Sequence, residues 1–180
     1  MKNLPSRRSF LQKTVMATTG VALLSSKTVI NALTKDDSPF SGYNPYAEEK
    51  TDLRTSSLFG KHLFVNGKIY DKSGKSTLSN VSIEVWHLSP DSKQYKHKAK
   101  LKTNNLGEYE FITDFPNKEF GKMSRIYFKV SNDFTSYFTE LLVDDFGVHI
   151  TGKHWEENQQ LGDNLFPLKD NSVITFNISI

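Results

Sequence analysis

The sequence has no cysteine among its 180 residues. Without thiols the chain forms no disulfide, offers no thiolate to a metal, has no cysteine nucleophile and lacks a cysteine for a lipid anchor. After residue 32 it also lacks an apolar run long enough to cross a bilayer. Its stability must therefore come from a packed core, and a domain of about 150 residues can bury about two-thirds of its unfolded surface.

Several catalytic signatures are absent as well. The sequence contains no G-x-S-x-G motif, no phosphate-binding glycine loop and no dinucleotide fingerprint. Its histidines do not show the H-x-H, H-x-x-x-H or H-E-x-x-H spacing that places two metal ligands on one face. The chain ends in TFNISI, which differs from the Tyr-Arg-Gly-Ser end of the 5-hydroxyisourate hydrolases. These absences argue against common hydrolase, nucleotide-binding and zinc-enzyme classes.

The N-terminal segment combines basic residues with a short apolar stretch. Residues 6–13 read SRRSFLQK, and residues 14–24 are moderately apolar. This segment resembles a bacterial twin-arginine export signal, which implies passage through the twin-arginine machinery to a periplasmic or secreted location. We expect residues 1–32 to be this signal, with cleavage near Ala32. The alternative is a basic, disordered N-terminus.

The charge balance changes when that segment is set aside. Residues 1–32 hold five of the 23 Lys and Arg residues and none of the 20 Asp and Glu residues, so the remainder has a net charge of −2. The basic isoelectric point belongs largely to the N-terminus, and the sequence predicts no nucleic-acid binding.

The rest of the chain is organised as a polar segment followed by one β-rich domain. Residues 33–60 contain proline, glycine and charged residues, and are expected to be a linker or an arm that wraps the domain. Residues 61–180 contain about seven short alternating runs separated by turn residues. The runs are residues 63–70, 81–88, 95–103, 107–113, 125–130, 134–143 and 173–180. We predict an all-β, immunoglobulin-like antiparallel β-sandwich, with a long loop at residues 146–172 before the last strand.

Three of these runs carry family-like motifs in a consistent order. Residues 67–71 (GKIYD) with Gly74 are similar to an opening G-x-V-x-D-x-x-G strand and turn. Residues 80–87 (NVSIEVWH) resemble an A-x-V-E-[IV]-W strand, and residues 105–111 (NLGEYEF) resemble D-x-x-G-x-Y-x-F. In order and spacing, residues 62–145 resemble the intradiol ring-cleavage dioxygenase family. Transthyretin-like and carboxypeptidase-regulatory sandwiches share the first and third pieces, so part of the signal reports fold.

That resemblance implies a ferric iron held by two tyrosinates and two histidines, because hard phenolate oxygens stabilise Fe(III). Tyr95 stands where the family places its first tyrosine. The family motif R-P-x-H-x-H-F falls on residues 122–128, which puts Lys122 at the arginine and Arg125 and Tyr127 at the two histidines. Residues 117–120 lack the expected second tyrosine. Arginine stays protonated and is donor-only, so the resemblance predicts a family member without the standard iron shell.

The same positions define a candidate cleft. Tyr95, Lys122, Arg125 and Tyr127 are expected to line it, and the two cations favour an anionic ligand such as a carboxylate. No cofactor is expected by the family pattern. The alternative is Fe(III) in a rebuilt site that uses Tyr95, Tyr127, His149 and His154, the last two of which lie near Glu156, Glu157 and Asp163 in the expected loop.

Three side chains outside the cleft are expected to be structural. His87 alternates with apolar residues and is predicted to point inward or to end its strand. His97 lies among lysines and is predicted to be exposed. Trp86 is expected to pack against apolar side chains or, as an alternative, to stack on a ligand.

Three functions remain open from the sequence. The first is an exported, diverged intradiol dioxygenase-like protein that binds a small aromatic or anionic ligand in the former active-site cleft. The second is an active ring-cleaving, non-haem iron dioxygenase with a rebuilt metal site. The third is a non-enzymatic sandwich that binds a protein or glycan, or serves as an accessory module.

Overall fold

The computed structural model describes residues 38–180, and the expected export signal lies outside this range. The described part contains ten strands, one α-helix and one 3-10 helix. They are β1 (His62–Tyr70), β2 (Ser82–His87), β3 (His97–Lys102), β4 (Glu108–Asp114), β5 (Ser124–Ser131), β6 (Ser136–Val143), β7 (Val148–Ile150), α3 (Gly152–Asn158), η1 (Gln159–Asn164), β8 (Leu168–Asp170), β9 (Val173–Thr175) and β10 (Ile178–Ser179). No helix in residues 38–180 has the length and apolar character that a membrane crossing requires.

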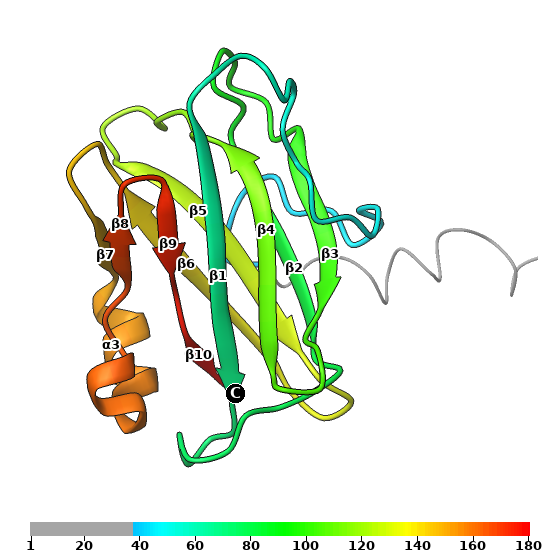
Figure 1. Ribbon diagram of the computed structural model, residues 1–180, viewed down its shortest axis with the longest axis vertical. Coiled ribbons are helices and arrows are strands. Elements are labelled where there is room, and N and C mark those ends of the chain that lie inside the picture. Colours follow the sequence, from blue (N-terminus) through cyan, green and yellow to red (C-terminus); the bar gives the residue numbers. More distant parts are fainter. Residues whose placement is uncertain (1–37) are drawn as a thin grey trace, which may run out of the picture. The chain divides into compact units, whose positions relative to one another are not determined.

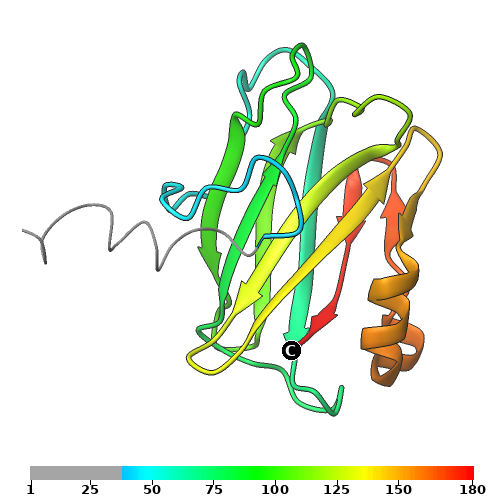
Figure 2. The ribbon, with the colours of Figure 1, turned by 180° about the vertical axis from the view of Figure 1, so that it is seen from behind.

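The strands form two five-stranded sheets that face each other (Figures 1 and 2). One sheet has the order β4–β1–β9–β8, with β10 also paired to β1, and the other has the order β3–β2–β5–β6–β7. The predicted all-β sandwich is therefore confirmed. Its antiparallel pairing is not uniform, because β1 pairs in parallel with both β9 and β10.

The core lies between the two sheets and is built by strict alternation. In β1, Leu63, Val65 and Ile69 are at most 1% exposed, while their neighbours are half-buried on the outer face. Inward residues of the other sheet, such as Ile83 and Phe128, complete one continuous apolar cluster. In β1 the period-two pattern thus marks the buried face, whereas β2 and β5 also bury side chains on their outer faces.

The polar segment before β1 joins the two sheets at one side of the sandwich. Residues 48–53 make backbone hydrogen bonds to Lys100 in β3 and to Ile112 in β4. Glu49 and Asp52 form parallel bridges to these same two residues. The segment therefore covers the edges of two strands that would otherwise present unpaired backbone groups.

Residues 146–172 are not the loop that the sequence predicts. They contain β7, α3, η1 and β8. The helix α3 has only seven residues, too few for a helical period to be read, and the Thr151 side chain caps its first turn. Its buried residues, His154 and Asn158, are both polar. The sequence therefore lacks the apolar stripe that normally indicates a helix.

Candidate functional site

Strand β5 carries the candidate site on its outer face. Ile126, Phe128 and Val130 point into the core, so the alternating residues Arg125, Tyr127 and Lys129 project from the opposite face. Tyr127 is nevertheless only 3% exposed. The outer face of this strand is therefore covered by other parts of the chain.

Glu119, in the loop between β4 and β5, lies at the centre of the site. The hydroxyl groups of Tyr95 and Tyr127 both donate to its Oε1 atom, at 2.7 and 2.6 Å. The ammonium group of Lys122 donates to Oε2 at 2.6 Å. Two phenols and one ammonium group thus converge on one carboxylate.

The local turn explains why Lys122 faces Glu119. The Lys122 backbone N–H donates to the Glu119 carbonyl at 3.0 Å, and Gly121 between them has φ of +72°. Glycine adopts this left-handed conformation without the steric cost that a Cβ imposes. The tight turn therefore brings two residues three positions apart into an ion pair.

These contacts set the protonation states. Burial acts to raise the pKa of Glu119, but the hydrogen bonds from Lys122, Tyr127 and Tyr95 outweigh it and hold the pKa at about 2. Burial, together with the bond to Glu119, raises the pKa of Tyr95 to about 12 and also raises that of Tyr127. At neutral pH both phenols keep their protons and donate them to a carboxylate anion.

Arg125 lies beside this group and is held by a different carboxylate. Its Nη1 atom donates to Glu140 Oε2 at 2.5 Å, across the β5–β6 pair. Its buried Nε atom has no hydrogen-bond partner among the described residues. Arg125 thus retains one unused donor next to the Glu119 cluster, because both residues line the same small space.

The N-terminal segment of the described chain covers the site. The ring of Phe40 lies 4.8 Å from that of Tyr127, and the ring of Tyr43 lies 5.1 Å from that of Trp86. The Trp86 indole N–H donates to the Ser41 carbonyl at 3.0 Å. Figure 2 shows this segment, coloured blue, crossing the face of the sheet. Trp86 is therefore buried as predicted, but on the outer face.

Two concavities border the Glu119 cluster. The first has a volume of about 570 Å³ and is lined by Lys93, Lys118, Glu119, Phe120, Gly121, Lys122 and Met123. The second lies between Leu88, Asn117, Glu119, Met123, Arg125 and Tyr127, and has no room for a water molecule. The cleft is thus filled at its inner end by the chain's own side chains and opens outward beside three lysines.

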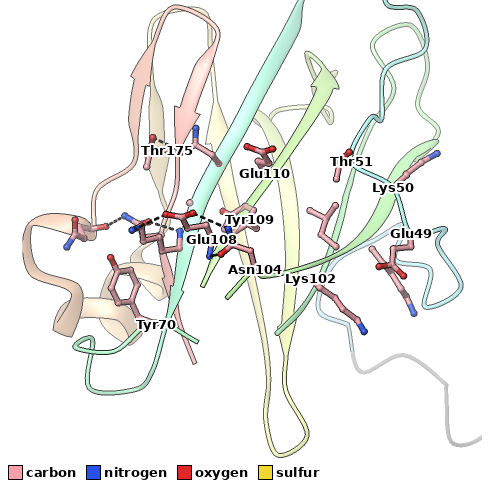
Figure 3. A pocket seen from close by; sticks show the side chains of 17 residues that line it. Glu49, Lys50, Thr51, Tyr70, Lys102, Asn104, Glu108, Tyr109, Glu110 and Thr175 are labelled. Atoms are coloured by element: carbon pink, nitrogen blue, oxygen red, sulfur yellow. Dashed lines mark hydrogen bonds and ion pairs between the residues drawn. The ribbon is translucent and has the colours of Figure 1, made fainter. Parts of the chain in front are cut away.

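A larger groove of about 830 Å³ is lined by residues of β1 and β4 in the other sheet, by residues of β3 and by residues 49–51 (Figure 3). Its polar side chains largely bind one another: Asn104 donates to Glu108, and Thr175 donates to Asn66. Lys68 pairs with Glu108 at 3.2 Å. None of the site residues predicted from the sequence lines this groove.

A second polar cluster lies near the end of β2 and is structural. His97 Nε2 contacts Asp114 Oδ2 at 2.9 Å, and its Nδ1 contacts Ser89 Oγ at 3.1 Å. The prediction that His97 is exposed is wrong, since the residue is only 4% exposed. Thr55, from the segment before β1, covers it by a contact to Nε2. His87 points inward as predicted and contacts Thr113 Oγ1 at 2.6 Å.

The alternative metal set is not assembled. His154 contacts Thr139 Oγ1 on the inner side of β6, and its ring lies 4.9 Å from that of Phe176, whereas Tyr127 projects from the outer face of β5. His149 lies two strands from Arg125 in the same row, which corresponds to about 10 Å. Its ring faces Asp144 at 3.5 Å. No cluster of three His, Cys, Asp or Glu residues suited to a metal occurs within residues 38–180.

The structure brings the four predicted cleft residues into one neighbourhood, since Tyr95, Lys122 and Tyr127 bind Glu119 and Arg125 lies beside it. Sequence reasoning missed Glu119, the residue on which the first three converge. It occurs in the segment where the family resemblance places a second tyrosine. The one feature of the sequence that could have indicated Glu119 is an acidic residue at that place, three residues before a lysine.

No family model matches the sequence, and no curated protein matches it. Solved structures do match. The dioxygenase domain of a dioxygenase–carbohydrate-binding protein fusion from Streptomyces sp. SirexAA-E has a TM-score of 0.59 and 18% identity, over 81% of this chain and 96% of that chain.

Two further matches belong to the same group. An intradiol ring-cleavage dioxygenase from Tetranychus urticae has a TM-score of 0.57 and 12% identity, over 77% of this chain and 89% of that chain. A catechol 1,2-dioxygenase from Acinetobacter sp. ADP1, inhibited by bound mercury, has a TM-score of 0.53 and 18% identity, over 85% and 66% of the two chains. The chain therefore has the fold of the intradiol dioxygenases, and identities this low show the fold alone.

The iron site implied by the family resemblance does not fit the residues at this place. Two tyrosines are present, but the groups that converge with them are Glu119 and Lys122, with Arg125 beside them. Within residues 38–180 no histidine has a hydrogen bond, ion pair or ring contact to these residues.

Proposed function

We propose that this protein is an exported relative of the intradiol dioxygenases that lacks the standard iron site and binds a small anionic or aromatic ligand in the former active-site cleft. The fold supports the relationship. The single observation that carries the ligand class is the carboxylate of Glu119, held by two phenols and an ammonium group.

Three hydrogen-bond donors around one carboxylate make an anion-binding site. Bonds to an ionised acceptor are shorter and about twice as strong as neutral ones. Here the chain's own Glu119 is the anion. A ligand carboxylate that displaces Glu119 finds the same three donors, and the free Nε atom of Arg125 offers a fourth nearby.

The surroundings favour entry of an anion. The outward concavity is lined by Lys93, Lys118 and Lys122, with Glu119 as its one acidic residue. When Glu119 swings away from Tyr127, it enters solvent beside these lysines. The local field therefore attracts a negatively charged ligand toward the cluster.

A thermal-shift titration of the full chain tests this function. Acetate, benzoate, catechol and glucose are compared, because a ligand that binds only the folded state raises the melting temperature with its concentration. We expect a shift with acetate and benzoate and none with glucose. The double variant Tyr95→Phe/Tyr127→Phe should lose the shift, while Tyr46→Phe, at an exposed position, should keep it. Equal shifts in the two variants would contradict the proposal.

A second candidate function follows from the same oxygen atoms. Two phenols and a carboxylate are hard donors of the kind that Fe(III) prefers. Lys122 and Arg125, both cations, oppose a trivalent ion there. If the protein is an active ring-cleaving enzyme, iron loading should produce a coloured protein through tyrosinate-to-iron charge transfer. A colourless, iron-free protein after loading would exclude this candidate.

A further inference from the structure

The groove of about 830 Å³ in Figure 3 is a second candidate binding site, which shares no lining residue with the concavities beside Glu119. Its floor is mainly the outer face of β1 and β4. One side is formed by β3 and residues 49–51, and the other by Asn164 at the end of η1 and Thr175 in β9. The volume of the groove lies within the range of about 300–1,000 Å³ that is usual for ligand sites.

The charged side chains of the groove nearly balance one another. Four lysines and three glutamates line it. Lys68 pairs with Glu108 at 3.2 Å, so these two charges neutralise each other on the floor. Mixed charges of this kind produce no strong field of one sign, unlike the lysines around the opening beside Glu119. The groove therefore favours a ligand without net charge.

The floor carries many groups that both donate and accept hydrogen bonds, since four asparagines, two threonines and two tyrosines also line the groove. Thr175 donates to Asn66 Oδ1 at 3.0 Å, and the Asn66 amide nitrogen has no partner among residues 38–180. Glu108 accepts from Asn104 at one oxygen and faces Lys68 at the other, and a carboxylate can accept further bonds. These fixed groups match hydroxyl groups, each of which donates and accepts.

Two side chains at the ends of the groove have no partner of their own. Tyr70, the last residue of β1, is half-buried, and Lys102, the last residue of β3, is exposed. Neither side chain forms a hydrogen bond or an ion pair within residues 38–180. Figure 3 shows them on opposite sides of Glu108. Because β4 separates β1 from β3, strand and sheet spacings place their backbones more than about 10 Å apart.

We propose that this groove binds a neutral oligosaccharide. One sugar ring packs its apolar face on the Tyr70 ring, which presents an apolar face and a polar edge. Hydroxyl groups of the following rings bind Asn66 and Glu108 on the floor and Lys102 at the far end. The distance between Tyr70 and Lys102 requires more than one sugar ring. This function goes beyond the proposed anion binding and uses none of the residues around Glu119.

Isothermal titration of the full chain with cellopentaose, maltopentaose and chitopentaose tests the inference, because each is a neutral linear chain of five rings. We expect at least one of them to bind at least about tenfold more tightly than glucose, the value of one further hydrogen bond to a charged group. Pentagalacturonate, which is anionic, is the comparison for charge. If none of the three neutral chains binds, or if pentagalacturonate alone binds, the inference is overturned.

Two substitutions test whether the saccharide lies in the groove. Tyr70→Ala should weaken binding about threefold to tenfold, the value of one aromatic contact, whereas Tyr70→Phe keeps the ring and should retain the affinity. Lys102→Ala should weaken binding about tenfold. Lys98→Ala is the matched control, because Lys98 lies four residues earlier on β3 and does not line the groove. Equal affinities of Lys102→Ala and Lys98→Ala would place the saccharide elsewhere and overturn the inference.

Circular dichroism and the melting temperature show whether each variant is folded. Lys102 is exposed and has no partner within residues 38–180, so Lys102→Ala decides the question if Tyr70→Ala does not fold. Acetate should not compete with the saccharide, because the groove and the Glu119 cluster share no residue. Failure of saccharide binding therefore leaves the anion-binding function standing, and a missing response to acetate leaves the saccharide result unchanged.

Discussion

The two faces of strand β5 carry side chains of opposite character, although both are largely hidden from water. The inner face presents Phe128 and its apolar neighbours to a dry core. The outer face presents Arg125, Tyr127 and Lys129, each hydrogen-bonded or ion-paired to a carboxylate or a phenol. The apolar side chains of the inner face require only close packing. Each buried polar group on the outer face requires a hydrogen-bond or ion-pair partner.

The difference between the two faces of β5 indicates where a binding site can form in this fold. Apolar packing is non-directional, and its loss costs stability alone. A buried polar group is stable only while its partner is present, so a competing partner can exchange with it. The outer face of β5 is therefore where we propose that a ligand binds, and the inner face holds the strand in place.

The largest expected effect is on the inner face. Phe128 is fully buried and lies 5.2 Å from Phe176 and 6.2 Å from Phe111, ring to ring. Phe128→Ala should lower the free energy of unfolding by about 3–5 kcal/mol, because it leaves a cavity in the core. Denaturation with urea measures this loss. Phe134→Ala should change it by less than about 0.5 kcal/mol, and similar losses in the two variants would break the comparison.

The next effect is on pH dependence and comes from two inward histidines. Burial is the main cause that lowers the pKa of His87 to about 3 and that of His154 to about 4, from the usual 6.5. The unfolded chain therefore binds more protons, and stability must fall as the pH drops below 6.5. We expect a loss of about 2 kcal/mol for each histidine at pH 5.

Urea denaturation between pH 8 and 5 checks that expectation. His154→Gln should flatten the profile by the contribution of one histidine. Below about pH 4.5 the unfolding free energy should fall further, because the pKa of Glu119 is lowered to about 2 in the folded protein. As the pH drops, Glu119 therefore becomes protonated in the unfolded chain before it does so in the folded one. A flat profile down to pH 5 would show that both histidines are hydrated in the folded state.

A smaller effect is expected from a charge pair on the outer face. Arg125→Met leaves the Glu140 carboxylate, whose side chain is 11% exposed, without its partner. We expect the unfolding free energy to fall by about 2 kcal/mol, the cost of a buried charged acceptor left unpaired. The double variant Arg125→Met/Glu140→Leu should recover most of that loss. Additive losses in the double-mutant cycle would contradict a coupled pair.

The smallest effect is that of one phenol. Tyr127→Phe removes one donor to Glu119 while keeping the ring that stacks on Trp86. The unfolding free energy should fall by about 1 kcal/mol, the net value of a single hydrogen bond. Tyr46→Phe, at a residue that is 67% exposed, serves as the control. If Tyr127→Phe lowered the unfolding free energy as much as Phe128→Ala does, the hydroxyl of Tyr127 would contribute as much to stability as a core side chain, contrary to this expectation.

Much of the fold followed from period-two alternation, which marks a strand by the residues that it buries. The short elements could not be predicted from this alternation, since β7 and β8 have three residues each and α3 buries a histidine and an asparagine. The direction in which the strands pair could not be predicted from the alternation either. The parallel contacts of β1 depend on the path of the chain through residues 146–172, and no local pattern encodes that path.

The sequence predicted which residues would lie near one another in the candidate cleft, but not the residue on which they converge. Tyr95, Arg125 and Tyr127 were expected in the cleft from their strand positions and from the family resemblance. Glu119 was missed because its importance depends on three donors that come from separate segments of the chain. Residues 38–43 lie in the segment that was expected to be a linker or an arm that wraps the domain, but its ring contacts to Tyr127 and Trp86 are long-range and were not predicted.

The most direct test of the account is rescue of Glu119→Ala by acetate. The substitution leaves Tyr95, Tyr127 and Lys122 without their shared acceptor, so the melting temperature should fall and added acetate should restore it. Glu110→Ala, at an exposed position on β4, controls for general salt effects. Equal responses of the two variants to acetate would contradict an anion-binding site on the outer face of β5.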